Sequence, residues 1–240
     1  NLANMVWAFA RAGLPSEKLY KAVADKAVQQ QLYGFKPQNL SNMVWAFATT
    51  GVHASQLYEA VADEAIRQQL HEFNPQQYAN MVWSFATAGV RADKLYSAVA
   101  GEAVRLKLRG FNQQNLTNMV WAFATAGVRS DNLYETMADE VMRQKLHGFK
   151  PQNLSTIVWA FAKADVHADE VYMTVANEAM RQQLHGFSPH QLAIMVWAFA
   201  TAGIRSDLFY KAVADEAMRR QLRGFKPQNL SNMVWAFAKA

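Results

Sequence analysis

Residues 39–48 read NLSNMVWAFA, and these letters return with small changes at a fixed distance along the 240-residue chain. Trp7 and Trp45 are 38 residues apart, and all seven tryptophans keep that spacing. A period between about 20 and 50 residues is typical of an array in which each unit packs on its neighbours. We therefore expect a single array over residues 1–240. Its units are 1–38, 39–76, 77–114, 115–152, 153–190 and 191–228, with a partial seventh at 229–240.

Each unit predicts two helices, called here the A helix and the B helix. Pro37 suits the first turn of the A helix in the second unit, and Gly51 suits its left-handed end. Asp165 replaces that glycine once, and Ser55 stands where we expect the N-cap of the B helix. Strand alternation is missing from the pattern. The predicted fold class is all-α, an α-solenoid forming a right-handed superhelix of six helical hairpins plus a partial seventh.

The letters of the A helix predict which side is buried. At about 100° per residue, Leu40, Val44 and Phe47 lie on one wide apolar arc, with Trp45 at its edge. We interpret the tryptophans as packing between units, in preference to a platform for stacked bases. The narrow remaining strip carries Asn39, Asn42, Ala46 and Thr49, and it predicts the lining of a concave groove.

The B helix predicts an outer, convex wall. In the second unit its exposed side carries Gln56, Glu59, Asp63 and Arg67, and the charges at these places vary freely between units. Asp63 and Arg67 have the spacing of an ion pair on one helix face. Arg67 and its equivalents have acidic neighbours, so we interpret them as structural, and we expect Asp63 and Glu64 to be surface carboxylates.

Composition limits the classes of function. Half of the residues are apolar, which permits a large core, and no apolar run reaches the roughly 18–20 residues of a membrane span. The chain has no cysteine, and we expect neither a cofactor nor a metal site. Without a leader or an initiating methionine, it resembles a piece of a longer protein. The net charge of +5 fits either an ordinary solvated surface or an anionic partner, with nucleic acid first.

Catalysis is not expected. An active site normally converges at one place, whereas the carboxylates of this chain repeat in every unit. The position that holds Tyr33, His71 and Arg109 in successive units excludes a periodic zinc site, because zinc would not accept these replacements.

The stretch PQNLSNMVWAFATTGV at 37–52, followed by LYEAVADEAI at 57–66, resembles the octotricopeptide repeat, a family of 38-residue helical hairpins. The resemblance extends over the whole chain. It implies sequence-selective binding of single-stranded RNA in organellar gene expression, and hence a chloroplast or a mitochondrion. The units are more alike than is usual in a natural array, which suggests recent duplication or consensus engineering.

One polar position of the A helix is the best candidate for reading bases. Asparagine can both donate and accept, so it can pair with a base edge, and modular recognition needs one such residue per unit. The alternative is a structural ladder that joins neighbouring A helices. The predicted base-facing series is Asn4, Asn42, Asn80, Asn118, Thr156, Ile194 and Asn232.

A second series of amides lies one turn earlier and predicts further contacts in the groove. Its alternative is capping of the helix start. The members are Asn1, Asn39, Gln77, Asn115, Asn153, Gln191 and Asn229.

Cations near the end of the A helix and in the following linker are candidates for phosphate contacts. They are Arg11, Lys163, Lys239, His53, Arg91, Arg129, His167 and Arg205.

We therefore predict binding of single-stranded RNA at about one base per repeat. The alternatives are a scaffold that binds proteins or peptides, and an array without a natural ligand. The apolar faces of the first and last A helices predict end-to-end stacking of copies.

Overall fold

The computed structural model describes residues 2–14 and 16–240, and within them helices joined by short turns are the only regular elements. This confirms the predicted all-α class. No helix of the described chain has the length and apolar character needed to cross a membrane. The helices are α1 Leu2–Arg11, α2 Glu17–Gln29, α3 Pro37–Thr50, α4 Ser55–Arg67, α5 Pro75–Ala88, α6 Asp93–Arg105, α7 Gln113–Ala126, α8 Asp131–Gln144, α9 Pro151–Lys163, α10 Asp169–Arg181, α11 Pro189–Ala202, α12 Asp207–Arg219 and α13 Pro227–Lys239.

The ends of the A helices, which are the odd-numbered helices, follow the prediction. Helix α3 begins at Pro37, and its C-cap Gly51 has a φ of 71°, in the left-handed region. Asp165 adopts the same conformation with a φ of 54°. The predicted N-cap of α4 was wrong by one residue: Ser55 is the first residue of α4, and Ala54 is its cap without a side-chain hydrogen bond.

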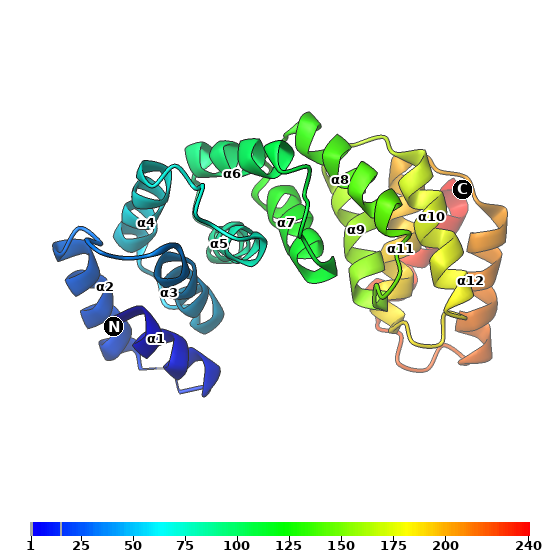
Figure 1. Ribbon diagram of the computed structural model, residues 1–240. Coiled ribbons are helices and arrows are strands. Elements are labelled where there is room, and N and C mark those ends of the chain that lie inside the picture. Colours follow the sequence, from blue (N-terminus) through cyan, green and yellow to red (C-terminus); the bar gives the residue numbers. More distant parts are fainter. Residues whose placement is uncertain (1, 15) are drawn as a thin grey trace. The chain divides into compact units, whose positions relative to one another are not determined.

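The chain divides into two compact units, Asn1–Leu133 and Tyr134–Ala240. In the first unit α1, α3, α5 and α7 pack side by side in chain order, with α2, α4 and α6 as a second row (Figure 1). In the second unit α9, α11 and α13 pack in the same way, and α10 contacts α12. Each unit is therefore a stack of helical hairpins, as expected of a repeat solenoid. The hand of the superhelix and the concave position of the A helices stay predictions.

In four repeats a buried tyrosine connects three helices, namely Tyr20, Tyr58, Tyr96 and Tyr172. The Tyr58 hydroxyl on α4 donates a hydrogen bond to the Val44 carbonyl on α3 at 3.1 Å. The Tyr58 ring meets Phe85 on α5 edge to face, with 4.9 Å between ring centroids. The side chains of Tyr58 and Phe85 are fully buried. One side chain thus fixes an A helix to its own B helix and to the next A helix.

A buried carboxylate stabilises the end of the B helix α4, and Glu140, Glu178 and Glu216 are buried at the same position of later repeats. Glu64 is 7 % exposed and forms an ion pair with Arg67 at 2.6 Å. Gln68 donates to Glu64 at 2.6 Å and to the Phe35 carbonyl of the preceding repeat at 2.9 Å. The predicted pairing of Arg67 with Asp63 and the surface position of Glu64 were wrong, whereas the structural interpretation of Arg67 fits these contacts.

Candidate nucleic-acid interface

The accessible ridge of the A helices differs from the predicted strip. In α3 the ridge consists of the exposed Gln38 and Thr49 and the half-buried Asn42 and Trp45. Their spacing of four, three and four residues keeps them on one helix face. Ala46, which was expected in the middle of the strip, is fully buried. The prediction was wrong at this position because the buried arc is turned slightly, so that Ala46 lies inside and Trp45 reaches solvent.

The tryptophans therefore contribute to the surface as well as to packing. Trp83 on α5 and Trp121 on α7 are half-buried, and their ring centroids are 6.4 Å apart. Trp7 and Trp235 are 37 % and 44 % exposed. Half-buried rings held beside polar side chains are suited to contacts with bases, because every base has an apolar face.

The predicted base-facing series lies on this ridge. Asn4 is exposed, and the six other members are half-buried: Asn42, Asn80, Asn118, Thr156, Ile194 and Asn232. Among the described residues of each compact unit, no hydrogen bond joins members of this series on neighbouring A helices. The structural ladder thus finds no support there. The side chains stand one turn from a tryptophan and remain partly open to solvent.

Glutamines one turn earlier contact two of these asparagines. Gln114 Nε2 donates to Asn118 Oδ1 at 2.7 Å, and Gln228 Nε2 donates to Asn232 Oδ1 at 2.9 Å. This glutamine position was not among the predicted site residues. The signal was present in the spacing, because residues four apart on a helix are neighbours.

The second amide series caps the A helices, which was its alternative interpretation. The Asn39 side chain accepts a hydrogen bond from the Lys36 main-chain N–H at 3.1 Å, and Gln77 accepts from Asn74 at 2.9 Å. Asn1 lies outside the described residues. The other members make the same contact: Asn115 with Asn112, Asn153 with Lys150, Gln191 with Ser188 and Asn229 with Lys226.

Two of the predicted phosphate contacts at the helix ends pack on aromatic rings. Arg11 lies over the Trp7 ring at 5.4 Å, and Lys239 lies over the Trp235 ring at 5.0 Å. Both side chains stay exposed, as does Lys163. Cations on the rim of an aromatic ridge can meet the phosphates of a strand whose bases face that ridge.

Two linker cations are partly neutralised by neighbouring carboxylates. Arg91 pairs with Asp93 at 2.9 Å, and Arg129 pairs with Asp131 at 2.7 Å. The hydrogen bond from Arg91 lowers the pKa of Asp93 below its usual value. These two arginines thus offer less net charge to a phosphate than the sequence suggested. The remaining linker candidates His53, His167 and Arg205 are exposed.

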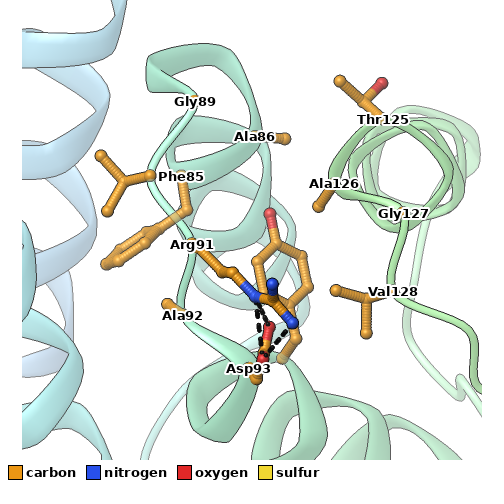
Figure 2. A pocket seen from close by; sticks show the side chains of 12 residues that line it. Phe85, Ala86, Gly89, Arg91, Ala92, Asp93, Thr125, Ala126, Gly127 and Val128 are labelled. Carbon is orange, nitrogen blue, oxygen red and sulfur yellow. Dashed lines mark hydrogen bonds and ion pairs between the residues drawn. The ribbon is translucent and has the colours of Figure 1, made fainter.

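A cleft of about 310 Å³ opens between the C-terminal ends of α5 and α7 (Figure 2). Ala86 and Thr125 face each other across it, and the Arg91–Asp93 pair lies at its base in this view. Thr125 belongs to the exposed end of the α7 ridge. The cleft therefore adjoins the ridge at its linker edge.

Comparison with known proteins identifies a family. Residues 1–181 match the family described as RNA-editing substrate-binding complex 6 protein. Residues 206–234 match a family described as protein of unknown function (DUF1601). No curated protein matches the chain. The first match covers most of the array, and its description is that of an RNA-associated family.

Proposed function

Because this chain belongs to the family of the RNA-editing substrate-binding complex 6 protein, we propose that it binds single-stranded RNA along the ridge of its A helices. The observation that carries the proposal is the ridge itself. Every A helix except α11, which carries Ile194, presents a polar side chain at the Asn42 position, and each has a half-buried or exposed tryptophan one turn further on. This combination pairs hydrogen bonds to base edges with apolar contact to base faces.

The spacing of the A helices supports one base per repeat, and the net charge of the chain supports an anionic partner. Neighbouring helices pack roughly 8–10 Å apart, a distance that an extended strand of RNA can follow. The net charge of +5 favours a polyanion. Exposed cations at the end of the ridge, such as Arg11, Lys163 and Lys239, are placed to meet phosphates.

The finer identity of the repeat rests on the resemblance to octotricopeptide repeats. On that basis we propose sequence-selective binding without catalysis, in a chloroplast or a mitochondrion. The series Asn4, Asn42, Asn80, Asn118, Thr156, Ile194 and Asn232 would supply base preference. A peptide-binding scaffold remains the rival hypothesis, and the experiment below separates the two.

The test is selection from a random RNA pool with the unchanged chain and with Asn42→Asp and Asn118→Asp. We expect an enriched motif that changes at one position in each variant, and binding that weakens steeply as salt rises. Asn177→Asp is the matched control, since Asn177 is exposed on the B helix α10 and lies off the ridge. Failure to enrich any sequence would reject the proposal, and enrichment that ignores both ridge variants would reject the base-reading role.

We also propose that copies of this 240-residue chain stack end to end. Val234 and Phe237 on α13 are 68 % and 37 % exposed, and Met5 on α1 is 43 % exposed. The equivalents of the α13 side chains in α3, Val44 and Phe47, are buried against neighbouring helices. Sedimentation should show association that rises with concentration and falls in Val234→Lys. A monomer at all concentrations would contradict this.

A further inference from the structure

The glutamine one turn before the base-facing position is exposed in α3, α5, α7, α9 and α13. In α7 and α13 its amide nitrogen donates to the carbonyl oxygen of the asparagine four residues later, as described above for Gln114 and Gln228. In these two helices the glutamine side chain lies over the half-buried asparagine. The series is Gln38, Gln76, Gln114, Gln152 and Gln228, with His190 in its place on α11.

We propose that each glutamine is a second specificity-determining residue, and that Gln114 and Asn118 read one base together. This inference rests on the proposed RNA-binding function. Asn118 Oδ1 is occupied by the Gln114 amide, which leaves Asn118 Nδ2 to donate and Gln114 Oε1 to accept. The pair therefore presents one donor and one acceptor side by side at the surface of the ridge.

Such a pair matches the Watson–Crick edge of an unpaired base. Each of the four bases carries a donor and an acceptor next to each other on that edge, so two hydrogen bonds form only when the base is unpaired. The pair would then select single strands over duplexes, because pairing covers the edge it reads. An asparagine without this glutamine could turn its amide and present its own Nδ2 and Oδ1 to either order of donor and acceptor on a base, so the glutamine adds discrimination by fixing that order.

Changes between the repeats of this chain support a coupled pair. On α11 both positions differ together: His190 replaces the glutamine where Ile194 replaces the asparagine. Isoleucine has no oxygen to accept a hydrogen bond, so a glutamine four residues earlier would lose its partner. On α9 Gln152 is kept where Thr156 still offers a hydroxyl.

The first experiment changes the glutamine alone. In Gln114→Glu the carboxylate can only accept, so the Asn118 amide is expected to turn and donate to it, exposing Oδ1. Two acceptors side by side suit the N1–H and N2–H donors of guanine. Selection from a random RNA pool should therefore enrich guanine at one position, with a change of about tenfold in preference at that position. Gln56→Glu is the charge-matched control, because Gln56 is exposed on the B helix α4.

The second experiment restores the pair where it is missing. His190→Gln with Ile194→Asn should give the α11 position the base preference of its neighbours, and Ile194→Asn alone should give a weaker preference. If the unchanged chain enriches no sequence, both the proposed function and this inference fail. If Asn118→Asp changes the motif but Gln114→Glu leaves it unchanged, the two-residue reader is overturned and RNA binding stands.

Discussion

The Tyr58 hydroxyl donates its hydrogen bond to the main-chain carbonyl of Val44, 14 residues earlier, in a site where both residues are buried. Equivalent bonds join Tyr20 to Val6 at 2.8 Å and Tyr96 to Val82 at 3.0 Å. In these three repeats the tyrosine hydroxyl therefore joins the B helix to the backbone of the A helix that carries the ridge.

Tyr58→Phe should lower the free energy of unfolding by about 1–2 kcal/mol, because the Val44 carbonyl loses its donor inside the core. The chain contains a matched control in Tyr210, whose buried hydroxyl has no hydrogen-bond partner. Tyr210→Phe should be neutral or slightly stabilising. Urea unfolding of both variants gives the comparison, and an equal loss of stability would contradict the role assigned to the Tyr58 hydroxyl.

The contact between Gln68 and Phe35 predicts a pair of opposite effects. Gln68→Leu should destabilise by about 1 kcal/mol, because the Phe35 carbonyl loses its donor from the next repeat. Leu106 stands at the equivalent place on the following B helix, after Glu102. Leu106→Gln should therefore stabilise the chain by a similar amount through the Phe73 carbonyl. Thermal unfolding measures both, and destabilisation by Leu106→Gln would show that this contact between repeats depends on more than the glutamine.

Asp165 marks a repeat whose A helix ends without glycine. Its φ of 54° is left-handed, a conformation that costs free energy for a residue with a side chain. Asp165→Gly should raise the free energy of unfolding by about 0.5–1 kcal/mol, after the entropy of the more flexible unfolded chain is counted. The reverse change Gly127→Asp should destabilise, although no atom lies within 4 Å of an added Cβ there. Urea titrations that ranked these two variants in the opposite order would reject the conformational explanation.

Glu216 should make the stability of the second compact unit, Tyr134–Ala240, sensitive to acid. Hydrogen bonds from Arg219 first, and also from Arg220, lower the pKa of Glu216 from 4.5 to about 2, and His185 Nδ1 lies 3.1 Å away. Because the folded pKa is depressed, the stabilisation is complete above pH 4.5 and is lost as the pH falls through about 2. This stabilisation amounts to about 3 kcal/mol at neutral pH.

The variant Glu216→Gln tests this pH dependence. Its stability deficit relative to the unchanged chain should be largest above pH 4.5 and shrink as the solution is acidified towards pH 2. Glu59→Gln on the exposed side of α4 serves as the control. Chemical unfolding at a series of pH values gives the measurement, and a deficit that stayed constant with pH would show that Arg219 and Arg220 do not act through the charge of Glu216.

The ends of the A helices could be predicted from the sequence, because residues that mark the start and end of a helix recur along the chain. Pro37 and Gly51 mark the two ends of α3 by conformational preferences that need no tertiary contact. Ser55 misled because a serine is also common in the first turn, and here Ala54 takes the capping position. The existence and order of the helices could thus be derived from single repeats.

Contacts between repeats were harder to predict from the sequence. Arg67 could reach either Asp63 or Glu64 on its own helix, and the choice depends on Gln68, which bridges Glu64 to Phe35 in the preceding repeat. The rotation of the A helix about its axis also depends on the neighbouring A helices. A small turn decides whether Trp45 or Ala46 reaches solvent, and periodicity alone cannot fix it.

The tryptophans are half-buried or exposed on the ridge, and their fluorescence gives a direct optical test of it. Every tryptophan of the chain lies on an A helix, so RNA whose bases cover the ridge should quench the intrinsic fluorescence. Trp83→Ala should reduce the quenching and weaken RNA binding by about 1–3 kcal/mol, and Trp83→Phe should weaken it less because a flat ring remains. Inorganic polyphosphate is the control, since it carries charge without bases. Quenching by polyphosphate equal to that by RNA would place the strand away from the tryptophans and limit the interface to its cations.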